Sequence, residues 1–496
     1  MRPIKGLSAL SILLAMSGCV SMAPKYVVPT PPVPQAWPGQ SSEQAKPGDE
    51  PLQTVSAIPW QDFYADARLR KVQELALQNN RDIRIAALNT EKAMAYYRIQ
   101  RAELFPTVSA LGIVSRSGTS SDSTTKQTEY AVSLGVSAWE LDFFGRIRSL
   151  KNRALEQYLA TEQARRSAQI SLLGEVANVY LALAADRERL NYAKETHTSQ
   201  QTSFKLIRRR FEVGASSELD VNRAQIGLET AREDAARFTS IVAQDQNALN
   251  LLVGATVPAE LLPDALGNVA VLKGISAGLP SEVLTLRPDI LAAENQLKAA
   301  NANIGAARAA FFPSISLTAG VGVASGDLSH LFNSESRSWA FAPQVILPIF
   351  DMGARSANLK VANVDRDIAL AQYEKAIQVA FREVADTLAQ RATVDDQLAA
   401  HESLVQALEG TLRLATARYK AGIDGYLGVL DAERSLYAAR QGLIALRQAR
   451  YASLVTLYKV LGGGNPEHVP DTALPKQAPA SVSGLQPGQT TPASDR

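Results

Sequence analysis

Few residues of this chain have the types and spacing that catalysis requires. The four histidines are scattered along 496 residues: His197, His330, His401 and His468. The sequence contains no metal-ligand spacing, phosphate-binding loop or nucleophile elbow. Gly320 and Gly322 are followed by Gly326, which does not complete a dinucleotide fingerprint, and they lie in an alternating segment where glycine permits close strand packing. The sequence therefore predicts no enzyme, no metal site and no bound cofactor.

The single cysteine of the chain, Cys19, follows a sequence typical of a lipoprotein cleavage site. A positively charged start and a short apolar run lead into Met16-Ser17-Gly18-Cys19. The run is too short to span a bilayer and is typical of a signal peptide over residues 1–18. We expect removal of this segment and a covalent lipid on Cys19. The residue after the cysteine is Val20 and not aspartate, and this resembles bacterial lipoproteins that are sorted to the outer membrane. The alternative is an ordinary secretory signal with an incidental cysteine, since Met16 stands where leucine is commoner.

The charge balance argues against a nucleic-acid partner. Lys and Arg number 51 and Asp and Glu number 49, which leaves a formal net charge of +2. The sequence shows neither a basic block nor a recognition motif, so we predict no nucleic-acid binding. Ala, Leu, Gln and Arg dominate long stretches, and this composition favours helices.

The elements that must position any site occur twice in the sequence. A shift of about 208 residues places Glu175-Val176-Ala177 on Glu383-Val384-Ala385, and Gly214 on Gly422. A repeat of this length indicates one architecture formed twice. The domains expected are an extended N-terminal tail over 19–69, a first repeat over 70–285 with a β-hairpin at about 106–142, a second repeat over 286–463 with a β-hairpin at about 313–348, and a partly disordered C-terminal tail over 464–496.

Proline-free stretches predict two very long helices, Arg146 to Glu212 and Arg355 to Lys420, each roughly 100 Å long. Glycine follows each helix and suits a left-handed closing residue. Shorter return helices should run to about Val253 and Leu461. We expect these to begin at Ser216 or Ser217 in the first half and at Asp424 in the second. Two further helices, Arg70 to Leu104 and Ser281 to Ala310, should stack end to end with the return helices.

Four segments alternate between apolar and small polar residues and predict strands: Thr107 to Ser115, Tyr130 to Ser137, Ile315 to Val323, and Trp339 to Val345. Their length and the polar loops between them match membrane-spanning hairpins. Aromatic residues lie at the strand-to-helix junctions, where an interfacial girdle would be: Trp139, Phe143, Phe144, Phe311, Phe312 and Phe350. A soluble sheet packed on a helix is the alternative.

Four strands leave two open edges, which lipid does not tolerate, so several copies must close a barrel. Small residues on one face favour twelve strands around a lumen over eight strands around a filled interior. The expected fold is that of an α+β membrane protein. Three chains would form a 12-stranded transmembrane β-barrel that continues into a long periplasmic α-helical barrel.

Three runs of this sequence resemble the bacterial outer membrane factors, the TolC-like channels, and especially their lipid-anchored efflux branch, typified by OprM. The runs are Trp139 to Arg146, Arg308 to Leu317, and Tyr426-Leu427 with Val429 to Ala432. The resemblance implies a homotrimeric exit channel in the bacterial outer membrane that exports drugs, solvents or other small toxic molecules. Its implied partners are a periplasmic membrane-fusion adaptor and a proton-driven inner-membrane transporter of the RND type. Two alternatives remain, a type I protein-secretion channel and a structural periplasmic adaptor.

The resemblance also implies two functional regions beside the glycine turns. The helical tips should dock the adaptor through small and apolar residues: Val213, Gly214, Ala215, Ala421, Gly422 and Ile423. Resembling channels narrow just beyond the second tip at an apolar ring and a carboxylate ring, and Leu427 and Asp431 match these positions. The hydroxyl of Tyr419 is expected to hold the return helix inward, and Arg223 occupies the equivalent of Asp431 in the first repeat.

Each assignment has a simpler alternative. The glycines could serve only to end helices, and Asp431 could pair with Arg434 or Arg223 on a solvated face. Gly428 stands where some resembling channels carry a second acidic ring, which predicts weaker blocking by divalent cations.

Overall fold

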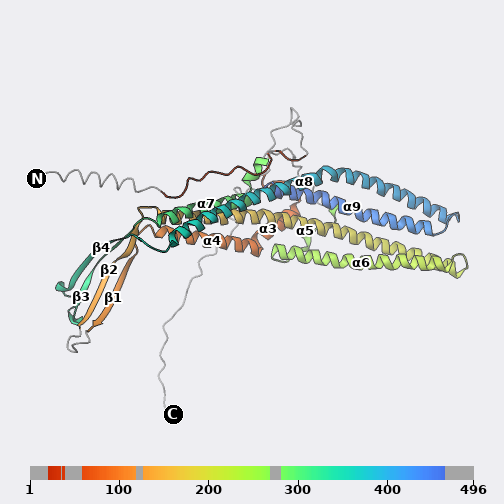
Figure 1. Ribbon diagram of the computed structural model, residues 1–496. Helices are drawn as coiled ribbons and strands as arrows, with labels where there is room; N and C mark the ends of the chain where they lie inside the picture. The colour runs from red at the N-terminus through yellow and green to blue at the C-terminus, as the bar shows by residue number, and fades with distance from the viewer. Residues whose placement is uncertain (1–20, 35, 39–57, 119–126, 269–280, 464–496) are drawn as a thin grey trace, which may run out of the picture.

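The computed structural model describes residues 21–34, 36–38, 58–118, 127–268 and 281–463. Within them, long helices form one elongated bundle, and a four-stranded sheet projects from one end of it (Figure 1). Cys19, the predicted signal peptide and the predicted C-terminal tail lie outside the described residues.

The two longest helices match the predicted bounds to within one residue. They are α5 (Arg146–Glu212) and α8 (Ala354–Lys420), and each has 67 residues. Gly214 and Gly422 follow them with φ of 75° and 73°, the left-handed conformation that glycine adopts without strain. The Ala215 and Ile423 amides then donate to the Arg210 and Arg418 carbonyls at 2.7 and 3.0 Å, which completes a Schellman closure of each helix.

The return helices are α6 (Glu218–Val253) and α9 (Leu427–Val460). Ser217 caps α6 as predicted, in a capping box with Asp220. The prediction that Asp424 begins the second return helix is wrong. α9 begins after Tyr426, without a side-chain cap, and the Asp424 carboxylate accepts hydrogen bonds from the Arg418 guanidinium at 2.5 and 3.1 Å. The Asp424 carboxylate is thus paired with a charged donor in the last turn of α8.

The two shorter helices are each interrupted, which the sequence analysis did not predict. The first divides into α3 (Ala67–Asn79) and α4 (Arg81–Ala102) at Asn80, whose side chain caps α4 and donates to the Leu252 carbonyl at 2.8 Å. The second divides at Arg287 into the 3₁₀ segment η4 (Ser281–Leu286) and α7 (Pro288–Ala309). A residue that precedes proline disfavours the helical conformation, which accounts for the second break.

These interruptions are the joints at which the short helices meet end to end. The closing glycine of α6, Gly254, lies against the backbone of Asn79 and Asn80, and Gly462 at the end of α9 lies against Arg287. As a result α4 and α6 line up along α5, while α7 and α9 line up along α8, as predicted (Figure 1).

The largest apolar core surrounds these joints. Phe63 of the short helix α2 (Trp60–Phe63) stacks on Tyr458 with 3.9 Å between ring centroids. Short 3₁₀ segments, η2 (Ala259–Leu261) and η3 (Leu266–Asn268), cover the same region. The described residues of the predicted extended tail are therefore extended only up to this core, where α2 and the start of α3 are helical.

The sheet contains β1 (Val108–Ser117), β2 (Gln127–Leu141), β3 (Ser314–Ser325) and β4 (Arg337–Ile346), antiparallel in that order. Short 3₁₀ segments, η5 (Leu328–His330) and η6 (Ser334–Ser336), lie between β3 and β4. The register places apolar side chains opposite one another on one face: Val108, Val132, Leu134, Val136, Val321, Val323, Trp339 and Phe341. The other face carries mainly Gly, Ser and Ala, with Leu111, Ile113 and Ile346 as its large apolar exceptions.

A bulge in β2 keeps this apolar face continuous. The register with β3 shifts between Val136 and Trp139, and Ala138 has a φ of 49°. One extra residue reverses the alternation of a strand, so Trp139 lies on the same face as Val136. The alternation in the sequence did not reveal this bulge.

Candidate functional site

The predicted docking residues lie at the two helical tips, at the end of the bundle farthest from the sheet (Figure 1). Val213 is 79% exposed and Ile423 is 62% exposed. A Cβ atom added at Gly214 or Gly422 would meet no heavy atom within 4 Å. The tips therefore present small, apolar and unobstructed backbone to whatever approaches them.

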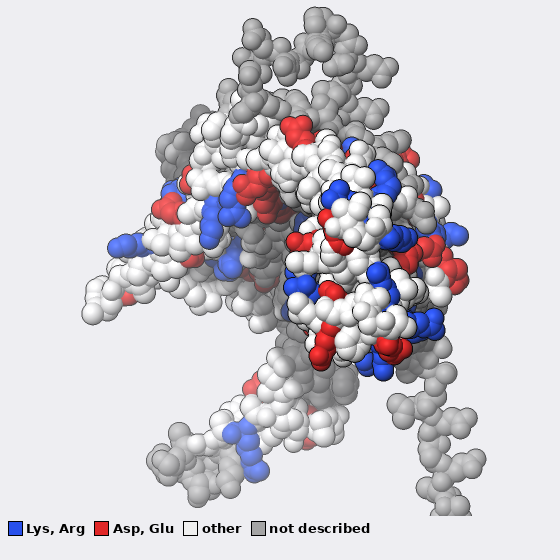
Figure 2. All heavy atoms as spheres, turned by 90° about the vertical axis from the view of Figure 1, so that its right-hand side faces the viewer, with Lys and Arg blue, Asp and Glu red and all other residues white. Residues whose placement is uncertain are grey.

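Charge of both signs is distributed over this end of the molecule. Figure 2, which views the tips end-on, shows Lys and Arg side chains interspersed with Asp and Glu. A surface without a field of one sign favours neither polyanions nor polycations.

Leu427 and Asp431 lie one turn apart on an exposed stripe of α9, as their spacing predicted. The neighbouring residues Val429 and Leu430 are buried against the tip of α5 in a small apolar cluster. Among the ion pairs of the described residues, Asp431 joins neither Arg434 nor Arg223. The side chain of Asp431 is therefore free to face another molecule.

Arg223 lies near the Asp220 carboxyl, and Tyr419 makes two contacts through its ring. Hydrogen bonds from Ser217, together with the nearby positive charge of Arg223, lower the pKa of the Asp220 carboxyl. Tyr419 uses its ring within this protomer: its centroid lies 5.3 Å from that of Tyr426, and the Arg210 guanidinium lies 5.1 Å above it. Within one protomer, Tyr419 therefore contacts the start of α9 through a tilted aromatic contact with Tyr426.

A polar network that the sequence analysis missed joins the two repeats near the tips. Gln200 of α5 is buried and donates to the Glu433 carboxylate of α9 at 2.8 Å, where burial raises the pKa of Glu433. Farther along, Tyr192 stacks on Tyr437 with centroids 5.4 Å apart. The sequence could not reveal this contact, because Gln200 lies 233 residues from Glu433 and only the structure shows that Gln200 is buried.

Three ion pairs bridge α8 and α9: Arg440–Glu409, Arg447–Glu402 and Arg450–Asp395, at 2.6, 3.5 and 2.7 Å. Between α5 and α6, by contrast, two carboxyl groups lie side by side. Asp186 is buried beside Asp245 and pairs with Arg189 at 2.6 Å. Burial, together with the neighbouring Asp186, raises the pKa of Asp245 to about 6.

Matching junctions connect the sheet to both long helices. Asp142 accepts hydrogen bonds from the first amides of α5, and Asp351 accepts from Gly353 and Arg355 at the start of α8. A left-handed glycine begins each helix. Phe144 stacks on Phe312 between the junctions with centroids 4.9 Å apart. The predicted aromatic cluster therefore lies where the sheet meets the helices.

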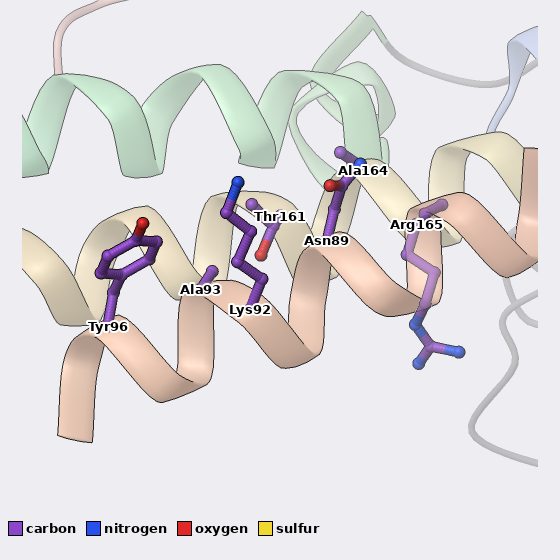
Figure 3. A pocket seen from close by; sticks show the side chains of 8 residues that line it. Asn89, Lys92, Ala93, Tyr96, Thr161, Ala164 and Arg165 are labelled. Atoms are coloured by element: carbon purple, nitrogen blue, oxygen red, sulfur yellow. The ribbon is translucent and has the colours of Figure 1, made fainter. Parts of the chain in front are cut away.

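The hollow between α4 and α5 carries no catalytic arrangement. It is an open groove of about 360 Å³ lined by eight residues, seven of which Figure 3 labels: Asn89, Lys92, Ala93, Tyr96, Thr161, Ala164 and Arg165. Lys92 and Tyr96 extend to one side, over α5, whereas Arg165 points to the other side. Throughout the described chain, no group of three His, Cys, Asp or Glu side chains is placed to hold a metal ion.

Comparison with known proteins agrees with this architecture. The chain matches the outer membrane efflux protein family over residues 72–255 and 279–463. It is 46% identical over 471 residues to the toluene efflux pump outer membrane protein TtgC and to the antibiotic efflux pump outer membrane protein ArpC, both of Pseudomonas putida, with 93% of this chain and 96% of each relative covered. The structure of the open Neisseria gonorrhoeae MtrE outer membrane channel superposes with a TM-score of 0.82 at 37% identity, covering 90% of this chain and 99% of that one.

The matched segments correspond to the two halves of the fold, each with one β-hairpin and its long helices. The chain therefore belongs to the outer membrane efflux protein family, as a non-enzymatic outer membrane channel component with the TolC-like fold.

Proposed function

We propose that three copies of this chain form the exit channel of a tripartite pump that exports antibiotics, organic solvents or other small toxic molecules across the bacterial outer membrane. The relatives named for toluene and antibiotic efflux support this substrate class over type I protein secretion. A periplasmic membrane-fusion adaptor and an RND-type inner-membrane transporter complete the proposed pump.

The observation that carries this proposal is the pair of unsatisfied edges on the protomer. β1 and β4 are the outer strands of the sheet, and each offers unpaired backbone groups on one side. The outermost helices beside them, α4 and α8, each expose a set of apolar side chains on one face, spaced three, eight and three residues apart on α4 and three and four apart on α8. These stripes are Ile85, Leu88, Tyr96 and Ile99 on α4, and Val361, Val364 and Ile368 on α8.

The two edges are different, so one copy's α4 edge fits the next copy's α8 edge and the contact closes into a ring. Their levels agree. Leu88 lies 14 residues before the end of α4 (102 − 88), and Ile368 lies 14 residues after the start of α8 (368 − 354). Both are therefore about 21 Å from the sheet end of the bundle. Three copies would give twelve strands, which suits the small residues of the inner face.

In this assembly the apolar sheet face contacts lipid, and a lipid on Cys19 adds a second, weaker attachment. The six tips dock the adaptor. Leu427 and Asp431 from three copies form an apolar ring and a carboxylate ring around the threefold axis, with Arg223 and Tyr419 nearby on each copy. Three carboxylates at close range repel one another, so the closed state depends on contacts such as Tyr419 with Tyr426 to keep α9 inward.

Disulfide trapping tests the ring. In a Cys19→Ser background, Leu88→Cys with Ile368→Cys should yield covalent dimers and trimers under mild oxidation, and nothing larger. Leu251, which is 80% exposed but lies on neither stripe, supplies the control: Leu251→Cys with Ile368→Cys should remain monomeric on a denaturing gel. A ladder that continues past three chains, or no link from the stripe pair, would contradict the proposed trimer.

A further inference from the structure

A hollow at the sheet end of the bundle has no role in the function proposed above. It is a wide, open hollow of about 500 Å³ between the first described residues of the chain and the sheet ends of α7 and α8. Its lining is Ser21, Met22, Ala23, Arg308, Phe311, Phe312 and Leu359. Phe311 and Phe312 remain 40% and 42% exposed, although they are large apolar side chains. β3 begins two residues later, at Ser314, so this hollow lies at the level where the proposed membrane begins.

The N-terminal segment enters the hollow in a fixed direction. Three residues on one face of α7, seven apart, hold it in sequence order. Arg308 donates to the Met22 carbonyl at 3.2 Å, Asn301 donates to the Pro24 carbonyl at 2.8 Å, and Glu294 accepts from the Tyr26 hydroxyl at 3.1 Å. The segment therefore runs antiparallel to α7, and its N-terminal end points toward the sheet.

The backbone of α7 is shaped for this contact. A Cβ atom at Gly305 would lie 2.7 Å from the Ala23 nitrogen, so only glycine leaves room for the segment there. At the other end of the segment Trp37 stacks on Phe381 with centroids 4.8 Å apart. The chain is thus held from the central core to the edge of the hollow.

A neighbouring copy would leave the hollow open. Leu359 precedes Val361 of the α8 stripe by two residues, which is about 200° around the helix. The hollow therefore faces away from the surface that pairs with the next protomer. Phe144 covers one face of Phe312 and Arg355 lies over Phe311, and the parts of both rings that stay exposed are open to a further apolar group. The lipidation site is near in sequence, because only two peptide units, at most about 8 Å of chain, separate Cys19 from Ser21.

We propose that the hollow seats a fatty acyl chain of the lipid on Cys19. This inference rests on the lipid attachment proposed above and adds a binding site on the protein for that lipid. The apolar rings and Leu359 supply the contact surface. The acyl chain then fixes the N-terminal segment to the junction of sheet and helices as well as to the membrane.

Photocrosslinking in the full-length protein tests this. Cells would be grown with a fatty acid that carries a photoactivatable diazirine, and the protein would be isolated from outer membranes after irradiation. We expect lipid adducts on the peptides that contain Phe311, Phe312 and Leu359. Phe311→Ala should lower the adduct yield at Leu359 several-fold. Phe143→Ala should not, because Phe143 is a junction phenylalanine of the same 40% exposure that does not line the hollow.

Two further measurements separate the possible outcomes. The mass of the mature N-terminal peptide tests the lipid itself: an unmodified Cys19 would overturn both the attachment and this inference. A lipidated Cys19 without adducts at the hollow would overturn the inference and leave the attachment intact. Adducts that persist in Cys19→Ser would show that a free membrane lipid occupies the hollow and would also overturn it. Adducts that disappear in Cys19→Ser support it.

Discussion

The end-to-end joint between α6 and α4 should be among the least tolerant positions in the molecule, and three glycines allow this to be measured. Gly214, Gly254 and Gly462 all follow a long helix with φ between 72° and 76°. An alanine at any of them pays the same left-handed strain, about 1 kcal/mol. They differ in what the added Cβ atom would meet, so the three substitutions separate strain from packing.

At Gly214 the Cβ atom meets nothing within 4 Å, so Gly214→Ala should cost only the strain, about 1 kcal/mol. At Gly462 the nearest atom is Arg287 Cγ at 3.3 Å, which a small side-chain adjustment relieves. At Gly254 the nearest atom is the Asn79 carbonyl oxygen at 2.4 Å, and this is backbone. Overpacking of this kind adds about 1–3 kcal/mol, so Gly254→Ala should cost about 2–4 kcal/mol.

The assay is the apparent melting temperature of the purified protein in detergent. All variants are measured at one scan rate, because large proteins often unfold irreversibly and the apparent melting temperature then depends on the scan rate. The destabilisation should increase in the order Gly214→Ala, Gly462→Ala, Gly254→Ala. Limited proteolysis should show the added cleavage of Gly254→Ala near Asn80. Equal melting temperatures for Gly254→Ala and Gly214→Ala would refute the close contact at the joint.

Three further predictions concern the tips, the gate and the buried acids. Leu427→Ala combined with Asp431→Ala should raise single-channel conductance in planar bilayers and sensitise cells to large antibiotics, and unchanged conductance would place the constriction elsewhere. Ala215→Glu or Ile423→Glu should abolish drug resistance while trimers still form, and full resistance in both variants would count against adaptor docking at the tips. Because burial beside Asp186 raises the pKa of Asp245 to about 6, above its unfolded value, folding binds a proton: stability should fall as pH rises from 4 through 6. Asp245→Asn should flatten this dependence of the melting temperature, and an unaltered pH profile would contradict the raised pKa of Asp245.

Local signals in the sequence predicted most of the architecture. The bounds of α5 and α8, the glycine turns and the four strands follow from helix periodicity, strand alternation and the left-handed preference of glycine. Each of these depends on neighbouring residues alone. The internal repeat strengthened these predictions, because each helix, turn and strand predicted in one half had a counterpart in the other half.

Three of the errors occurred where a specific side-chain contact, near or distant in sequence, overrides a backbone preference. Asn80 interrupts a helix because it caps α4 while its amide reaches Leu252, and Asp424 does not cap α9 because Arg418 takes its carboxylate. The bulge at Ala138 belongs to the same class. Its amide donates to the Thr318 hydroxyl on the neighbouring strand, and the extra residue restores the apolar face that pairing with β3 requires.

The sequence by itself determined which segments are helices or strands and where the chain turns, because backbone preferences and side-chain periodicity act over a few residues. Only the tertiary structure decided which residues share a surface. The Gln200–Glu433 contact between repeats, the matched levels of the α4 and α8 stripes and the hollow beside Phe311 each join segments tens to hundreds of residues apart. Their existence depends on how long helices line up against one another, and no local pattern encodes that alignment.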